Sequence, residues 1–379
     1  MRYLKQRSLS AEAKAQTGEM LATIGAMNKE LRSKPVYSLE PKWQIGVDIQ
    51  IQLLTEYGVE NFKRTVSHGY QNFVMSSFYD PQVIQLLKTM QTHFTEEPWF
   101  NTIETPDHVG IHDRIYDDDV EKHFDNPTYK LANPEDREIY RLAVGLLWEQ
   151  VLATDSFNIL KNLEESEIGN PMRIWRKGKL ISSDLAHSVR ERNMLMKPLY
   201  LDGTENLTVM EIGAGHGRLA EVFGKTTNYR YVIFDITPAL YVAQWYITKV
   251  FQYEKIFLFR HFDDFKEVEQ ELNESRFAFL TPNQIECFPD GYFDLSVNMN
   301  SLGEMRLDQV ENYLHQIDRL TKQGFMSRQE FHDKSKNKWL EKFSKETFAL
   351  PDERWQLVVD KMDDFHPYFF NQVWKREDK

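Results

Sequence analysis

The stretch from Val209 to Ala220, VMEIGAGHGRLA, constrains the fold of this chain more than any other. A short apolar run containing Glu211 leads into glycines at alternate positions, and a helical pattern follows them. A strand that ends in a glycine-rich turn and continues into a helix is typical of the first unit of a doubly wound parallel sheet. Glycine suits this turn because it adopts positive φ and lets a ligand approach the backbone. The stretch therefore predicts an α/β fold with a binding site at the turn.

The spacing of the glycines separates two classes of ligand. The dinucleotide fingerprint G-x-G-x-x-G requires its third glycine at Arg218, whereas this chain reads E-x-G-x-G-x-G. An acidic residue directly before the glycines repels a pyrophosphate and suits an ammonium or sulfonium centre. The pattern favours S-adenosylmethionine (SAM), with S-adenosylhomocysteine (SAH) as its product, and argues against an NAD-dependent dehydrogenase.

Length, charge and cysteine content narrow the class of protein. The 379 residues exceed one average domain, which predicts two parts. The net charge of −12 argues against a nucleic-acid substrate, because phosphate binding usually needs a basic surface. A single cysteine, Cys287, allows no internal disulfide and fits a reducing compartment. With neither a membrane-length apolar run nor a secretory signal in the sequence, we expect a cytoplasmic protein without a membrane partner.

Residues 1–181 are predicted to form a mostly helical N-terminal region that serves as a lid and binds the acceptor. Asp80-Pro81 is typical of a helix start, and apolar residues at helical spacing follow it to Phe94. A second apolar stripe runs from Ile139 to Leu152. The segment 174–181 is compatible with a short hairpin, and Ser182-Ser183-Asp184 precedes a further helix at the hinge between the two regions.

Residues 182–379 alternate between strand and helix patterns, which indicates a parallel sheet. We expect strands near 207–212, 231–234, 277–280, 292–297 and 324–331, and a terminal antiparallel hairpin from 355–362 and 368–374. The run 256–259 is either a further strand or part of an insertion. For the helices, Thr237-Pro238 is an expected start, Asp308 and Glu311 form a capping-box pattern, and Gly324 is an expected stop.

The second half of the chain resembles a class I SAM-dependent methyltransferase. EIGAGHG at 211–217 is similar to the first motif of that family, Asp235 to its ribose-binding acid, and FPDGYFDLSV at 288–297 to the segment entering its fourth strand. More narrowly, the chain resembles the bacterial sugar O-methyltransferase family from about residue 55 onward. The segments that carry this resemblance are GNP at 169–171, SSDLAHSVRE at 182–191, EIGAGHGR at 211–218, FDITPALY at 234–241, NMNSLGEM at 298–305 and, in the first half, NFKRTVSHGYQNF at 61–73. His216 departs from the pattern, because a tyrosine is commoner there.

The resemblance implies a Rossmann-like class I methyltransferase sheet and assigns SAM contacts within it. Glu211 is placed for the ammonium, the loop Gly213-Ala214-Gly215 with Gly217 for the backbone contacts, and Asp235 for the ribose hydroxyls. The remaining candidates are Ile236 against adenine, Gln284 at the adenine amino group, Asn298 on the methionine side, and Ser183 and Ser188 at the hinge. Each has a structural alternative: a tight turn for the glycines, a helix cap for Asp235, and local caps for the serines.

The catalytic base is the least determined part of the site. A sugar hydroxyl needs a general base or a metal to become a nucleophile. Glu304 follows the fourth strand and is the first candidate, although a carboxylate at a helix start is also simply favoured by the dipole. His187 is the second candidate, or a packed helical histidine. The patch from His112 to His123 is expected to be solvated, so no metal site is predicted.

Three functions remain open after this reasoning. The leading hypothesis is a SAM-dependent O-methyltransferase that acts on a hydroxyl of a sugar or a sugar-containing metabolite, with a homo-oligomer left open. The second keeps the chemistry but takes a non-sugar small molecule with an oxygen or nitrogen acceptor. The third is a SAM-binding scaffold without catalysis. The fold alone does not separate these, because specificity is set by the site and the surrounding region.

Overall fold

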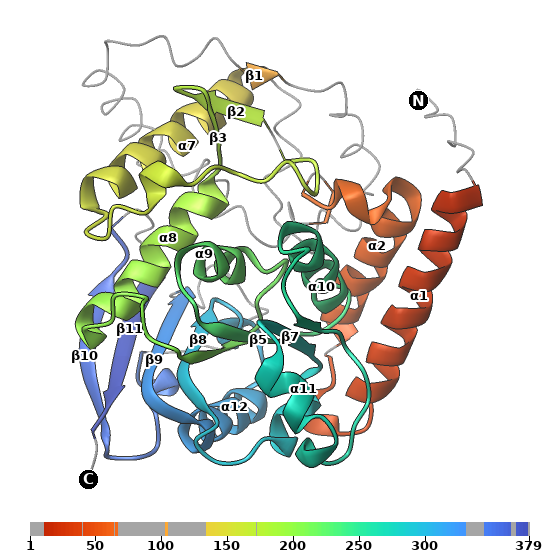
Figure 1. Cartoon of the computed structure of the whole chain (residues 1–379), viewed down its shortest axis with the longest axis vertical. Coiled ribbons are helices and arrows are strands. Elements are labelled where there is room, and N and C mark those ends of the chain that lie inside the picture. Colours follow the sequence, from red (N-terminus) through yellow and green to blue (C-terminus); the bar gives the residue numbers. More distant parts are fainter. Residues whose placement is uncertain are drawn as a thin grey trace.

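The central feature of the computed structural model is one mixed sheet with helices on both faces (Figure 1). The structure describes residues 11–39, 41–63, 65–66, 103–104, 134–171, 173–330, 345–364 and 369–377. Within them, the sheet has eight strands in the order β10-β11-β9-β8-β4-β5-β7-β6. The strands are β4 (Thr208–Ile212), β5 (Arg230–Phe234), β6 (Ile256–Phe257), β7 (Phe277–Leu280), β8 (Phe293–Met299), β9 (Thr321–Glu330), β10 (Trp355–Met362) and β11 (Phe369–Arg376).

The pairing of the strands confirms the predicted fold class. Strand β4 pairs in parallel with both β5 and β8, so the strand before the glycine turn is central in the sheet. Strand β11 pairs antiparallel with β9 and with β10, which is the expected terminal hairpin. The central strands are buried on both faces, as the near-continuous apolar runs predicted. The order of the parallel strands reverses at β4, where open α/β sheets bind ligands.

Successive side chains of the strands point to opposite faces of the sheet and belong to two apolar clusters, one on each face. Val209 and Ile233 belong to the cluster beneath α8 (Ser183–Met196), α9 (Arg218–Thr226) and α10 (Ala239–Val250). Met210 and Val232 belong to the cluster that includes α11 (Glu269–Glu274) and α12 (Leu307–Leu320). The sheet is therefore the middle of three layers. The helices cover its faces, and a binding site can form at the ends of its strands.

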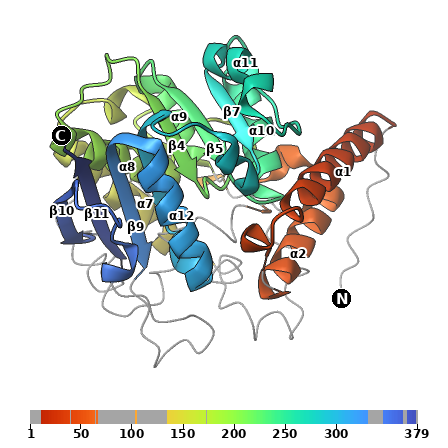
Figure 2. The same cartoon turned by 90° about the horizontal axis from the view of Figure 1, so that it is seen from below.

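The N-terminal elements wrap around the edge of these layers (Figure 2). They are α1 (Ala11–Leu31), the 3-10 turn η1 (Pro35–Tyr37), α2 (Pro41–Tyr57) and the 3-10 turn η2 (Val59–Asn61). Met20 and Ile24 of α1 join the cluster of α9 and α10, whereas Leu31 and Tyr37 join the cluster of α12. Thus α1 spans from one face of the sheet to the other, and the N-terminal segment shares its core.

A small outer unit covers the other side of α8. Helix α7 (Pro134–Thr154) packs with α8 through an apolar cluster that includes Val144 and Leu147. The hairpin β2 (Arg173–Arg176) and β3 (Lys179–Ile181) forms as expected, and the two-residue strand β1 (Ile103–Glu104) joins it. Among the described residues of the N-terminal region, β1, β2 and β3 are the strands, and the predicted mostly helical character holds for the rest. The helix expected after Asp80 and the patch from His112 to His123 lie outside the described residues.

Several local expectations need correction. Helix α12 has Arg306 at its N-cap, and the Arg306 amide donates to Oε1 of Gln309 at 3.2 Å; Asp308 and Glu311 do not form the cap, because the helix begins one residue before the expected cap. Gly324 does not stop that helix; it lies inside β9, where an added Cβ would meet Leu199 at 2.4 Å. The undecided run at 256–259 contributes the edge strand β6, which pairs with β7. The hydroxyl of Thr237 bonds to Asn28 of α1 instead of capping α10. No helix of the described part of the chain has the length and apolarity to cross a bilayer.

Candidate functional site

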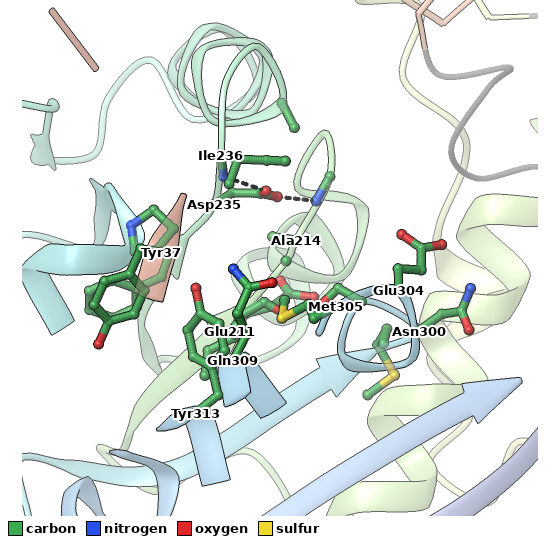
Figure 3. Close-up of a pocket in the computed structure, with 18 of the residues that line it drawn as sticks. Tyr37, Glu211, Ala214, Asp235, Ile236, Asn300, Glu304, Met305, Gln309 and Tyr313 are labelled. Carbon is green, nitrogen blue, oxygen red and sulfur yellow. Dashed lines mark hydrogen bonds between the residues drawn. The ribbon is translucent and has the colours of Figure 1, made fainter. Parts of the chain in front are cut away.

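A cavity opens at the carboxyl ends of β4, β5 and β8, with Tyr37 of the N-terminal turn η1 at one side of it (Figure 3). Its floor is the glycine loop after β4, and its sides come from residues that follow β5 and β8 and from α12. The lining is mixed, with apolar and aromatic side chains and a few polar groups, as is usual for small-molecule sites. The lining residues are Tyr37, Ser38, Leu39, Trp43, Glu211, Ile212, Gly213, Ala214, Gly215, Arg218, Phe234, Asp235, Ile236, Ala239, Pro282, Met299, Asn300, Ser301, Glu304, Met305, Gln309 and Tyr313.

The glycine loop presents backbone, not side chains, to this cavity. Gly213 has φ +73° and Gly215 has φ +59°, a region that side-chain-bearing residues rarely adopt. A Cβ on Gly213 would lie 2.1 Å from the Oγ of Ser301. The loop therefore needs glycine both for its conformation and for the close approach of the segment after β8.

Asp235 lies at the end of β5 and faces the glycine loop. Its Oδ2 accepts a hydrogen bond of 2.7 Å from the amide of Gly215, and its Oδ1 accepts one of 2.7 Å from the amide of Ile236. Burial raises the pKa of this carboxyl to about 7, against the lowering effect of these amides. Each oxygen keeps further lone pairs. Asp235 can therefore hold the loop in place and still accept hydrogen bonds from ligand hydroxyls.

Glu211 is a buried carboxyl at the end of β4, 2% exposed. Tyr231 donates a hydrogen bond of 2.9 Å to its Oε2. Burial raises the pKa of Glu211 to about 8, although the nearby guanidinium of Arg218 and the bond from Tyr231 lower it. A buried carboxyl with a raised pKa in a cavity wall is suited to bind a cation, because the cation restores the charged form.

Arg218 was not predicted to be a site residue, and it lies in the same cavity wall. Its Nη1 donates to Oε2 of Glu191 at 2.6 Å and its Nη2 donates to Oε1 of Glu191 at 3.0 Å. Nη1 also donates to the Oγ of Ser188 at 2.8 Å. Acidic and basic groups thus alternate from Glu211 and Arg218 in the wall to Glu191, which lies behind the lining.

The N-terminal segment closes one side of the cavity, which the sequence did not reveal. Tyr37, Ser38, Leu39 and Trp43 all belong to the lining. The indole Nε1 of Trp43 donates to the backbone carbonyl of Glu304 at 3.1 Å. We call residues 34–39 together with Trp43 the N-terminal strap. No motif marked it, because its link to the site exists only through contacts with residues more than 150 positions away along the chain.

The predicted SAM contacts divide into two groups in the structure. Six of them line the cavity: Glu211, Gly213, Ala214, Gly215, Asp235 and Ile236. Gly217 does not; it is the N-cap of α9, with φ +83° and an added Cβ 3.2 Å from Ile247 of α10. Its positive φ completes the turn into α9, which is the structural alternative left open for the glycines, and the absence of a side chain allows close packing against α10.

Four further candidates do not line the cavity and instead support the structure around it. Gln284 bonds to the backbone amide of Thr281 at 3.0 Å and to the carbonyl of Arg260 at 2.9 Å. Asn298 donates to the carbonyl of Ile212 at 2.8 Å and accepts from the amide of Leu302. Buried amides fully engaged with backbone hold strand ends in place. Ser183 and Ser188 are buried in α8, and Ser188 reaches the cavity only through Arg218.

The two candidate bases are placed differently. Glu304, in the 3-10 turn η10 (Leu302–Glu304), lies in the cavity lining with its neighbours Asn300 and Met305 (Figure 3). His187 is fully buried in α8, outside the lining, near the carboxylate of Asp363. The octet 298–305 therefore contributes to the site as expected, whereas His187 faces away from it. Among the described residues, no group of three or more His, Cys, Asp or Glu side chains is arranged to hold a metal ion.

Comparisons with known proteins give only distant similarities. No family model matches the chain, and no curated protein matches it. The magnesium protoporphyrin IX methyltransferase of Synechocystis PCC 6803, with bound SAM, is similar over 51% of this chain and 82% of its own, at 12% identity and a TM-score of 0.36.

Two other solved structures are similar to the same extent. The N-methyltransferase NodS of Bradyrhizobium japonicum WM9, in complex with SAH, matches 50% of this chain and 88% of its own, at 15% identity and a TM-score of 0.32. A SAM-dependent methyltransferase of Aquifex aeolicus matches 49% and 89%, at 13% identity and a TM-score of 0.31. At these values neither the activity nor the substrate of these proteins carries over to this chain.

Proposed function

We propose that this protein is a SAM-dependent methyltransferase whose acceptor is a hydroxyl of a sugar or a sugar-containing metabolite. The observation that carries the proposal is the cavity at the end of β4, where Glu211, the backbone of the glycine loop and Asp235 lie together. The sugar acceptor rests on the sequence resemblance alone, the proposed cytoplasmic location rests on the single cysteine, and a homo-oligomer stays an expectation. A non-sugar acceptor is the alternative within the same chemistry.

The residues of the cavity fit the parts of SAM. A bound ammonium group would lower the raised pKa of Glu211, because a cation beside a buried carboxyl favours its charged form. The free lone pairs of Asp235 suit the two ribose hydroxyls, and Ile236 provides an apolar surface for the adenine. The glycine loop leaves room for the connecting atoms. These groups bind and orient the cofactor.

Bound SAM supplies an activated methyl group, so the protein has to position the acceptor and remove its proton. The acceptor oxygen forms a bond to the methyl carbon as the bond from that carbon to sulfur breaks, and the electron pair remains on sulfur. Glu304 is our candidate to take the hydroxyl proton, because its side chain lies in the lining on the side of η10. Holding the oxygen in line with the breaking bond is the main catalytic contribution.

Calorimetric titration of the purified protein with SAM and with SAH tests the proposal directly. We expect both SAM and SAH to bind at one site, and we expect NAD not to bind. If neither SAM nor SAH binds, the proposed function is wrong. Incubation with methyl-labelled SAM and fractionated metabolites, followed by glycosidase treatment of the labelled products, then separates a sugar acceptor from a non-sugar one.

The base assignment has its own test. Glu304→Gln should lower turnover at least tenfold at neutral pH while SAH affinity changes less than threefold, because the amide cannot accept the proton as a carboxylate does. Glu311→Gln, an exposed carboxyl on α12, is the matched control and should leave both values unchanged. An active Glu304→Gln enzyme would require another base, and inactive wild-type protein that still binds SAM would favour the scaffold alternative.

A further inference from the structure

Arg218 is the charged side chain of the cavity wall to which the proposed reaction gives no role. It is the first residue of α9, directly after the glycine loop, and its side chain is only 6% exposed. Burial by itself would lower the pKa of this guanidinium, but the carboxylate of Glu191 more than offsets that effect and the pKa lies above its ordinary value. A full positive charge is therefore held beside the glycine loop.

The position of this charge is fixed by α8. Glu191 binds the guanidinium through two parallel hydrogen bonds, and Ser188, one turn earlier on α8, accepts a third. Glu191 is 3% exposed and Ser188 is fully buried, so neither side chain exchanges its partner with water. Two bonds in the plane of the guanidinium fix its orientation as well as its distance.

We propose that Arg218 binds the carboxylate of the cofactor's amino-acid end while Glu211 binds its ammonium, and that Glu191 and Ser188 are positioning residues that act through Arg218. This inference rests on the proposed function. Arg218 and Glu211 line the same cavity on either side of the glycine loop, and each influences the charge of the other. An amino-acid zwitterion that leaves water needs an opposite partner for each of its charges.

The competing explanation is that Arg218 only joins α8 to α9. In that case its loss weakens the fold, and any effect on binding is the same for every adenosyl ligand. In the proposed role, the loss of Arg218 weakens the binding only of those ligands that carry the carboxylate. A cycle that combines protein variants with truncated ligands separates these two cases.

The experiment is calorimetry of wild type and Arg218→Gln with three ligands: SAH, its decarboxylated analogue with only the amine, and its deaminated analogue with only the carboxylate. We expect Arg218→Gln to weaken SAH and the deaminated analogue by roughly 10- to 100-fold. The decarboxylated analogue should change less than threefold. Glu211→Gln should show the reverse pattern, with the larger loss for ligands that keep the amine.

Two conservative variants extend the cycle to the positioning residues. Arg218→Lys keeps the charge but not the paired geometry, so it should recover part of the discrimination between SAH and its decarboxylated analogue. Glu191→Gln should reduce that discrimination without abolishing it. Equal losses for all three ligands in Arg218→Gln, in protein that remains folded by circular dichroism, would overturn the inference. Absence of SAH binding to the wild type would instead remove the proposed function itself.

Discussion

Asp235 combines an observed structural role with the binding role that we propose for it. Both of its oxygens accept backbone amides of the site, from Gly215 and Ile236. Asp235→Asn replaces one acceptor with a donor that opposes an amide, so the loop and the ribose contact are weakened together. We expect SAH affinity to fall by roughly tenfold or more, since a hydrogen bond to a charged group contributes about 1.5–3 kcal/mol. Calorimetric titration measures this loss.

Asp294 provides the matched control for that variant. It also accepts a backbone amide, that of Thr208, at 2.8 Å, but at the opposite end of the sheet. Asp294→Asn should lower the unfolding midpoint while SAH affinity stays within twofold of the wild type. If both aspartate variants reduce affinity equally, the effect is general destabilisation and the role given to Asp235 is wrong.

The raised pKa of Glu211, about 8, predicts proton release on binding. Below that pH the empty site holds the carboxyl in its neutral form, whereas a bound ammonium favours the carboxylate. Ligand affinity should therefore rise as pH increases from 6 toward 8, and the binding reaction should release a proton in the lower part of that range. Calorimetry in two buffers with different ionisation enthalpies measures the released protons.

Glu211→Gln is the control for this titration because it keeps the shape of the side chain and cannot ionise. Asp235, with a pKa raised to about 7, titrates in an overlapping range, so part of the proton release should persist in this variant. Proton release that is unchanged in Glu211→Gln would show that another group accounts for it.

At the scale of elements, the N-terminal strap is held over the cavity mainly by α12. The Nε2 of Gln309 donates to the carbonyls of Val36 and Ser38, at 2.8 and 3.2 Å, and Arg306 donates to the same Ser38 carbonyl. Gln309→Ala removes the first two bonds and also the bond of 3.2 Å that Oε1 of Gln309 accepts from the amide of Arg306 at the start of α12. We expect faster amide hydrogen exchange at residues 35–39 and faster dissociation of SAH, while global stability falls by only about 1–2 kcal/mol.

Gln316→Ala on the same helix is the comparison for the strap. Its side chain accepts two hydrogen bonds from Arg319 of the same helix. The two alanine variants make a similar change in helix propensity, so a difference in exchange and dissociation isolates the strap contacts. Equal dissociation rates in both variants would mean that the strap does not limit release of the ligand.

At the scale of the whole molecule, a buried ion pair joins the N-terminal segment to the sheet layers. Lys63 pairs with Glu165 and donates to the hydroxyl of Tyr246 on α10 at 2.9 Å. Lys63→Met leaves a buried carboxylate without its partner, which typically costs about 3–5 kcal/mol. Because Phe62, Ile24 and Val209 belong to one apolar cluster, urea should still unfold the variant in a single transition at a lower midpoint.

Lys255→Met is the control for this effect. Lys255 and Glu274 form an exposed pair, with side chains 51% and 48% exposed, and pairs in water contribute little. Its urea midpoint should stay close to that of the wild type. Two separate transitions in Lys63→Met, followed by tryptophan fluorescence and circular dichroism, would indicate that residues 1–181 and 182–379 unfold as independent domains.

The sequence by itself determined the features that depend on local pattern. Apolar runs of strand length set β4, β5 and β8, and the glycine spacing after Glu211 placed the turn and the site at the strand ends. These features are readable because strand periodicity and positive φ constrain residue type at each position. The wrong assignments, at Asp308 and Gly324, are helix boundaries, where one residue of shift changes which side chain is the cap.

Only the tertiary structure decided which polar residues near the site reach the cavity. Gln284 and Asn298 lie beside strand ends, as expected. Their side-chain amides form hydrogen bonds with backbone groups that would otherwise be buried without partners. The strap and Arg218 reach the cavity through packing of α1, α8 and α9, contacts between residues far apart along the chain. A sequence pattern specifies which face of an element is apolar, whereas the partner of each face is set by the packing of the complete chain.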